Sequence, residues 1–123
     1  MGLASLRADQ RAVLIERLRE QVAALALPGD VAVCLVGSWA RGEQSGLSDI
    51  DLLVVAPEHR LERARDRLLD VADDVVAIET GSWQRRLAEG DPLIQGLAED
   101  AVALTTPPPS PSAAPGGSGR SGG

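Results

Sequence analysis

The amino-acid sequence alternates between amphipathic segments with helical spacing and short apolar runs rich in Val and Leu. The first amphipathic segment covers residues 9–25, and Asp9 is a suitable N-cap for a helix there. Its apolar residues recur at spacings of three and four, which is typical of a helix with one buried face. These residues are Val13, Leu14, Leu18, Val22 and Leu25. We therefore expect an amphipathic helix that packs against a core.

Three apolar runs, residues 31–36, 48–55 and 74–79, are short and rich in β-branched residues, which predicts buried strands. Helical patterns cover residues 58–72, 83–89 and 91–100, and residues 101–104 are a candidate for a short last strand. Within 58–72 the stretch ERARDR predicts a solvated outer face. Strands separated by helices indicate an α/β (α+β) domain with a small sheet.

The composition indicates one domain, residues 1–106, followed by a disordered tail, residues 107–123, that is rich in Pro, Gly and Ser. The formal net charge is −6, and all 12 basic residues are arginines. An acidic chain without a basic cluster is not expected to bind nucleic acid strongly. No apolar run is long enough to cross a membrane. A single cysteine, Cys34, provides no disulfide framework. We therefore expect a cytoplasmic protein.

Two acidic residues, Asp49 and Asp51, stand two positions apart in the second apolar run. Residues at this spacing in a strand point to the same face of the sheet. Two neighbouring carboxylates repel each other unless a cation joins them. Mg²⁺ prefers oxygen ligands and commonly binds one or two carboxylates together with substrate phosphates. The pair is therefore a candidate metal site for phosphoryl transfer, because carboxylates at this spacing can hold two ions roughly 3.5–4 Å apart. Two such aspartates by themselves are more often a solvated strand edge.

A glycine and a serine, Gly37 and Ser38, directly follow the first predicted strand. A glycine at this position lets the backbone approach a phosphate closely. The backbone N–H and the hydroxyl group of Ser38 are suitable donors to phosphate oxygens. Arg41 adds a cation within the same turn, where it either contacts a phosphate or is solvated. The turn is a candidate phosphate-binding segment, although a Gly-Ser turn by itself is more often only structural.

Taken together, Gly37-Ser38-Trp39-Ala40-Arg41-Gly42, five further residues, and Ser48-Asp49-Ile50-Asp51-Leu52-Leu53-Val54 resemble the signature of the DNA polymerase beta-like nucleotidyltransferases. The similarity is greatest to their minimal form, the MNT-type antitoxins encoded beside HEPN-domain toxins. It covers most of residues 10–104. The resemblance implies a three-stranded mixed sheet flanked by about four helices.

The resemblance also implies the roles of individual residues. Gly37 and Ser38 would hold the phosphates of ATP or another nucleoside triphosphate, and Asp49 and Asp51 would hold two Mg²⁺ ions. A third carboxylate would come from the next strand, where Asp73 and Asp74 are the candidates. We choose Asp74, because it directly precedes the run Val75-Val76-Ala77-Ile78 as in members of the family. It would orient or deprotonate the attacking hydroxyl group.

The expected function is Mg²⁺-dependent transfer of a nucleoside monophosphate, AMP from ATP, to a hydroxyl group of a partner protein. By resemblance the partner is a HEPN-domain toxin, and this chain is its antitoxin. One alternative is an inactive antitoxin that neutralises its partner by occlusion. Another is a transferase that acts on a small hydroxylated molecule, which would need an oligomer to complete the acceptor cleft.

Overall fold

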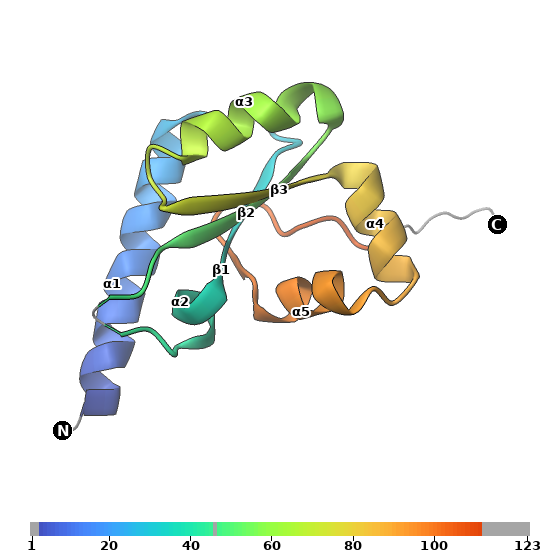
Figure 1. The fold of residues 1–123 in the computed structure, drawn as a ribbon. Coiled ribbons are helices and arrows are strands. Elements are labelled where there is room, and N and C mark those ends of the chain that lie inside the picture. The colour runs from blue at the N-terminus through green and yellow to red at the C-terminus, as the bar shows by residue number, and fades with distance from the viewer. Residues whose placement is uncertain (1–2, 46, 112–123) are drawn as a thin grey trace.

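The computed structural model describes residues 3–45 and 47–111. In this part of the chain, helices and strands follow one another in the order shown in Figure 1. The elements are α1 (Leu3–Ala24), β1 (Ala32–Val36), α2 (Gly37–Arg41), β2 (Asp51–Ala56), α3 (Glu58–Leu68), β3 (Asp74–Glu79), α4 (Thr80–Ala88), α5 (Pro92–Asp100) and β4 (Val102–Ala103). None of the described helices is long and apolar enough to cross a membrane.

The strands form one mixed sheet in the order β3-β2-β1-β4. β1 pairs antiparallel with β2 and with β4, whereas β2 and β3 run parallel. The parallel pair places Asp51 directly opposite Asp74. The α+β class and the mixed sheet are confirmed, but the described part has four strands rather than three. The additional strand is only two residues long, and the neighbouring Leu104 and Thr105 extend its pairing by donating backbone N–H groups to the carbonyl of Val33.

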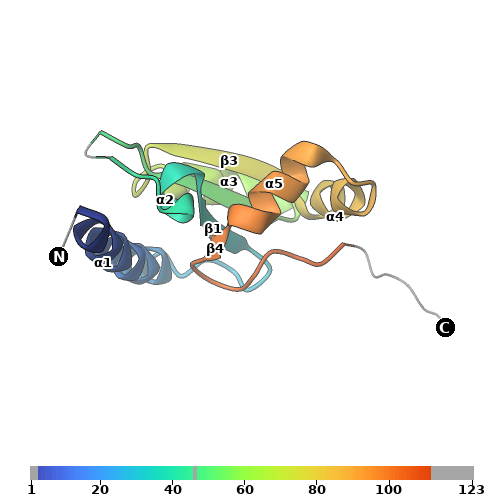
Figure 2. The same ribbon diagram turned by 90° about the horizontal axis from the view of Figure 1, so that it is seen from below.

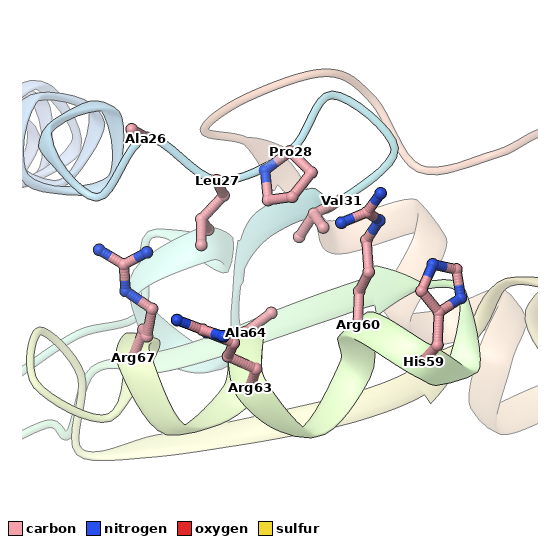
Figure 3. A pocket seen from close by; sticks show the side chains of 9 residues that line it. All are labelled: Ala26, Leu27, Pro28, Val31, His59, Arg60, Arg63, Ala64 and Arg67. Carbon is pink, nitrogen blue, oxygen red and sulfur yellow. The ribbon is translucent and has the colours of Figure 1, made fainter.

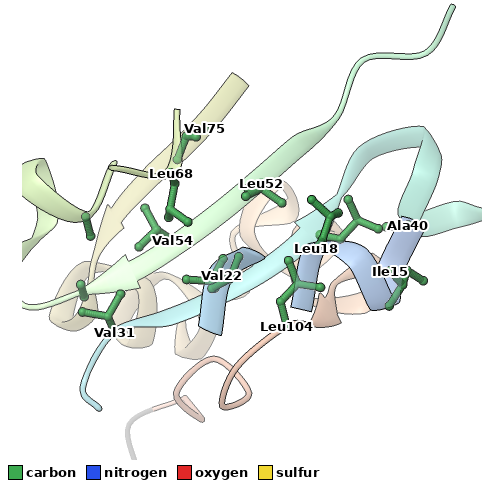
Figure 4. Close-up of a cluster of buried hydrophobic side chains, with 14 residues drawn as sticks. Ile15, Leu18, Val22, Val31, Ala40, Leu52, Val54, Leu68, Val75 and Leu104 are labelled. Atoms are coloured by element: carbon green, nitrogen blue, oxygen red, sulfur yellow. The ribbon is translucent and has the colours of Figure 1, made fainter. Parts of the chain in front are cut away.

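Helices cover both faces of the sheet. In Figures 1 and 2, α1 lies to one side of the strands, and α4 and α5 lie to the other. Alternate strand residues point to opposite faces. Val33 and Leu35 of β1 therefore join the cluster with α1 and α3 that Figure 4 shows, whereas Cys34 packs with Trp83 of α4 and Ile94 of α5. Burial raises the pKa of the Cys34 thiol to about 11, so this cysteine is protonated and unreactive at neutral pH.

The first helix differs from the prediction in its start and in its buried face. It begins at Leu3 rather than after Asp9, because the preceding residues favour helix and include neither Gly nor Pro. Its buried residues are Ile15, Leu18 and Val22, and Val13 is 57% exposed. Val13 and Ile15 are two positions apart, so they cannot lie on the same helix face. The predicted stripe was therefore wrong at its first residue.

The second strand begins at Asp51 rather than at Ser48. Ser48 is part of a turn, in which its hydroxyl oxygen accepts a hydrogen bond of 2.7 Å from the backbone N–H of Ser45. Asp49 and Ile50 therefore precede β2. Consequently, the strand periodicity that was expected to align Asp49 with Asp51 does not extend to Asp49.

The end of the described chain returns to the domain. The indole N–H of Trp83, which is fully buried, donates a hydrogen bond of 3.0 Å to the carbonyl oxygen of Pro109. Residues 107–111, which were assigned to a disordered tail, thus include an acceptor for a core residue. The remainder of the predicted tail, residues 112–123, lies outside the described residues.

Candidate active site

A cavity of about 380 Å³ lies at the end of the sheet where β1 ends and where β2 and β3 begin. Gly37 and Arg41 of α2 and Asp51 and Asp74 of the strands line it on one side. The other wall is formed by one face of α5. The α5 residues that line the cavity are Pro92, Leu93, Gly96, Leu97 and Asp100. The structure therefore brings four of the six predicted site residues to one cavity.

The carboxylates of Asp51 and Asp74 are brought together by the pairing of β2 with β3. Each residue is the first of its strand, and the two are direct partners in the parallel register. Burial, followed by the negative charges of Asp74, Asp49 and Asp73, raises the pKa of Asp51 above its ordinary value. A cation would relieve this repulsion, so the donor set suits a hard divalent ion.

Gly37 is next to the carboxylate of Asp51. Its φ angle is +78°, and a Cβ atom at this position would lie 2.6 Å from Oδ2 of Asp51. Every other residue type would strain the backbone and displace the carboxylate. The sequence therefore requires glycine here so that the α2 turn can begin beside the acidic group. Phosphate oxygens on this turn would lie close to any ion that Asp51 holds.

Asp73 and Asp74 have different environments, although they are neighbours in the sequence. Oδ2 of Asp73 accepts a hydrogen bond of 2.7 Å from the backbone N–H of Ile50. The backbone N–H groups of Asp73 and Asp74 both donate to the carbonyl of Ile50. Asp73 thereby fastens the start of β2 to β3, whereas Asp74 lines the cavity. Of the two candidates for the third carboxylate, Asp74 is thus the one at the cavity, and its role stays a prediction.

The remaining predicted residues lie around the cavity. Ser38 is partly exposed in the first turn of α2, and Asp49 is exposed and does not line the cavity. Among the described residues, no group of three or more His, Cys, Asp or Glu side chains is close enough together to hold a metal ion. Asp51 and Asp74 are the two carboxylates that line the cavity, where substrate phosphates would supply further oxygen ligands to a metal ion. The role of Asp49 stays a prediction.

Arg41 is held at the rim of the cavity by two carboxylates. Its Nε atom lies 3.0 Å from Oε1 of Glu43, and its guanidinium group lies 3.8 Å from Oδ2 of Asp100. The hydrogen bond to Glu43 and the charges of Glu43 and Asp100 raise the pKa of Arg41. The guanidinium group remains partly exposed, so an anion in the cavity can reach it only in competition with Glu43 and Asp100.

Two contributions to this site were not foreseen from the sequence. Arg11 of α1 donates hydrogen bonds of 2.8 and 2.9 Å to the carbonyl oxygens of Trp39 and Ala40, and so holds the C-terminal half of α2. Gly96 of α5 lines the cavity, and a Cβ atom there would meet no other group within 4 Å. A glycine in the middle of a helix costs about 1 kcal/mol relative to alanine. The structure shows no close contact that requires glycine at this position.

Comparison with known families agrees with this geometry. The model of the nucleotidyltransferase domain matches residues 15–93, and the chain belongs to this family. The matched range contains the Gly-Ser turn, both strands that carry the carboxylates, and the beginning of α5. Membership of this family supports nucleotidyl transfer as the general chemistry of the domain.

Among curated proteins, the chain is similar to a bifunctional uridylyltransferase/uridylyl-removing enzyme of Aromatoleum aromaticum (strain DSM 19018 / LMG 30748 / EbN1). The two are 29% identical over an alignment of 106 residues, and the match covers 66% of this chain and 12% of the relative. The chain thus spans a small part of the length of that protein. No solved structure matched the chain.

Proposed function

We propose that the chain transfers a nucleoside monophosphate, AMP from ATP, to a hydroxyl group of a partner protein, with Mg²⁺ as the metal. The observation that carries this proposal is the pairing of Asp51 with Asp74 in a cavity that begins at Gly37. This arrangement offers oxygen ligands and a close backbone approach for phosphate at the same place.

Each residue has a defined task in this reaction. Asp51 and Asp74 would hold the metal, with Asp49 as the further ligand that the sequence motif supplies. The bound metal would neutralise charge on the triphosphate and on the leaving pyrophosphate. Gly37 and Ser38 would hold the β- and γ-phosphates. The protein would thus act by positioning and by electrostatics rather than by a covalent intermediate.

The acceptor hydroxyl group would be oriented by Asp74, which lies at the start of the edge strand β3 and is exposed. It would then attack the α-phosphorus, the bond to pyrophosphate would break, and the proton would pass to the carboxylate or to water. Leu93 of α5, which is 62% exposed, lies at the edge of the same cavity. This apolar side chain is available to an acceptor that is itself a protein surface.

The resemblance of the Gly-Ser and Asp-x-Asp motif to the minimal nucleotidyltransferases supports a HEPN-domain toxin as the partner and an antitoxin role for this chain. The similarity to a uridylyltransferase supports UMP from UTP as the second candidate for the transferred group. The two candidates share one chemistry and differ only in the base.

The experiment uses the chain together with the product of its neighbouring gene. Each nucleoside triphosphate is labelled at the α-phosphate, and Mg²⁺ is either added or chelated. We expect label on the partner from ATP, only with Mg²⁺, and none with Asp51→Asn or Asp74→Asn. Label from UTP alone would replace AMP by UMP. No label from either nucleotide, or equal label without metal, would refute the proposal.

Asp73→Asn provides the matched control. It changes the neighbouring residue in the same way, and the asparagine side chain can still accept the hydrogen bond from the N–H of Ile50. We expect this variant to label the partner as the wild type does. If Asp73→Asn abolished labelling and Asp74→Asn did not, the assignment of the third carboxylate would be reversed. Asp49→Asn tests separately whether the exposed carboxylate is a ligand.

A further inference from the structure

A second cavity lies between α3 and the segment that connects α1 to β1. Its volume is about 340 Å³, and Figure 3 shows the side chains that line it. α3 supplies four side chains that carry nitrogen, namely His59, Arg60, Arg63 and Arg67. The opposite wall is mainly apolar and includes Leu27, Pro28 and Val31. The cavity therefore combines cationic groups with an apolar surface.

The three arginines share one stripe of α3 because they are spaced by three and four residues. Like charges at this spacing destabilise a helix by a few tenths of a kcal/mol per pair. Arg60 is neutralised by Asp30, with 3.0 Å between Nε and Oδ2. The guanidinium groups of Arg63 and Arg67 make no ion pair or hydrogen bond with any residue of the ranges 3–45 and 47–111. Both side chains are exposed, so in a chain with a net charge of −6 they place two positive charges beside one cavity, where an anion can reach them.

This cavity is separate from the candidate active site. It includes Val31, which precedes β1, whereas the other cavity includes Gly37, which follows β1. The intervening extended chain spans roughly 20 Å at about 3.3 Å per residue. In Figure 1 the turn before β1 lies beside α3, and α2 and α5 lie at the other end of β1. The two cavities share no lining residue, so an anion in one does not occupy the other.

We infer that this cavity binds a small phosphomonoester whose phosphoryl group pairs with Arg63 and Arg67 and whose apolar body lies against Pro28 and Val31. Guanidinium groups form charge-assisted, bidentate hydrogen bonds with phosphate oxygens. The volume of about 340 Å³ is at the lower end of the range for small-molecule sites. A free inorganic anion would leave the apolar wall unused, and this wall selects for an organic phosphate.

The test uses phenyl phosphate, which has a phosphomonoester group and an apolar ring but no nucleoside. Binding is measured by calorimetry at low salt, and the site is located by amide chemical shifts. We expect saturable binding, with the largest shifts in residues 26–31 and 59–67. The double variant Arg63→Gln, Arg67→Gln should weaken binding by at least about tenfold, because hydrogen bonds between charged groups are lost.

Arg65→Gln is the matched control. Arg65 belongs to the same helix but does not line the cavity. Its guanidinium group forms an ion pair with Asp66, with 3.7 Å between Nη1 and Oδ1. We expect it to leave the affinity for phenyl phosphate unchanged. Inorganic phosphate and phenol should each bind more weakly than phenyl phosphate. A ribo-oligonucleotide without a terminal phosphate should not compete.

Several results would overturn the inference. They are the absence of saturable binding, an equal loss of affinity in Arg65→Gln, and shifts that centre on Gly37 and Asp74. Binding of inorganic phosphate as tight as that of phenyl phosphate would exclude the role of the apolar wall. Competition by the unphosphorylated oligonucleotide would instead indicate a nucleic-acid surface.

Discussion

Replacing Gly37 by alanine should lower the melting temperature moderately and the rate of transfer strongly, and the structure allows both effects to be estimated. Gly37 has a φ angle of +78°, and the new Cβ atom would lie 2.6 Å from Oδ2 of Asp51. Gly42 has nearly the same backbone angle, +75°, but a Cβ atom there would have nothing within 4 Å. The two glycines are therefore a matched pair, because both substitutions introduce the same backbone strain and only one meets the carboxylate.

The backbone strain should be similar in both variants. A residue other than glycine in the left-handed region costs roughly 1–2 kcal/mol. For a domain of this size, each kcal/mol lowers Tm by about 4–8 °C, so both variants should melt roughly 4–16 °C below the wild type. The contact with Asp51 adds little to this loss, because a terminal carboxylate can rotate away. However, a displacement of about 1 Å at a reacting group can reduce the rate by about a hundredfold.

The assay combines thermal unfolding, followed by circular dichroism, with Mg²⁺-dependent binding of ATP and transfer of its label. Both variants should be compared well below their melting temperatures. We expect Gly37→Ala to lose about a hundredfold in transfer and Gly42→Ala to keep the wild-type rate. Equal activity of the two variants would refute the explanation that glycine at position 37 protects the position of Asp51. An unchanged Tm in both would refute the strain argument.

Two further predictions concern stability. Asp51→Asn should raise Tm at neutral pH while it abolishes transfer, because ionised Asp51 destabilises the fold through burial and repulsion. Its raised pKa means that the native state holds the proton more tightly than the unfolded chain, so the wild type loses stability as the pH rises from 3.8 through the raised value. The higher Tm of Asp51→Asn should therefore be seen at pH values above the raised pKa of Asp51 and should vanish below pH 3.8. A chain that ends at residue 106 should be less stable by about 1–3 kcal/mol than one that ends at residue 111, because the indole N–H of Trp83 loses its acceptor.

Each of these predictions has a control. Asp66→Asn removes the same charge from an exposed position on α3 and should show no comparable gain in Tm. A gain of equal size there would assign the effect to net charge. For the shortened chains, tryptophan fluorescence should show a red shift only when residues 107–111 are absent. Identical melting curves of the two chains would mean that the hydrogen bond from Trp83 to Pro109 contributes nothing to stability.

Much of the fold was predictable because its signals are local. The run from Asp74 to Glu79 is a strand, as predicted, and Asp91 caps α5 by accepting hydrogen bonds from the N–H groups of Leu93 and Ile94. The Gly37 turn and Asp51 also lie together as the sequence pattern indicated. These features depend on residue spacing, on the residue types that form turns and on the missing side chain of glycine. All three can be read from the sequence alone.

The remaining features depend on which parts of the chain meet in space. Asp49 lies before the start of β2, because Ser48 is held in a turn by its hydrogen bond with the N–H of Ser45. The backbone N–H and carbonyl of Ile50 are both hydrogen-bonded to Asp73. The arginines of α3 were predicted to form a solvated face, and Arg63 and Arg67 are exposed as expected. The prediction did not include the cavity that these two side chains also line. Their spacing placed them on one stripe, but the opposite wall comes from residues 26–31, which the helix pattern alone cannot indicate.

The two hydrogen bonds from Arg11 make the first half of α1 and the turn at Gly37 parts of one cooperative unit. No residue of α1 lines the cavity of the candidate active site. The guanidinium group of Arg11 nevertheless donates hydrogen bonds to the carbonyl oxygens of Trp39 and Ala40 in α2. Any local unfolding that frees the start of α1 therefore releases α2 as well. By reciprocity, we expect that a nucleotide bound as proposed at the Gly37 turn will slow amide exchange in α1.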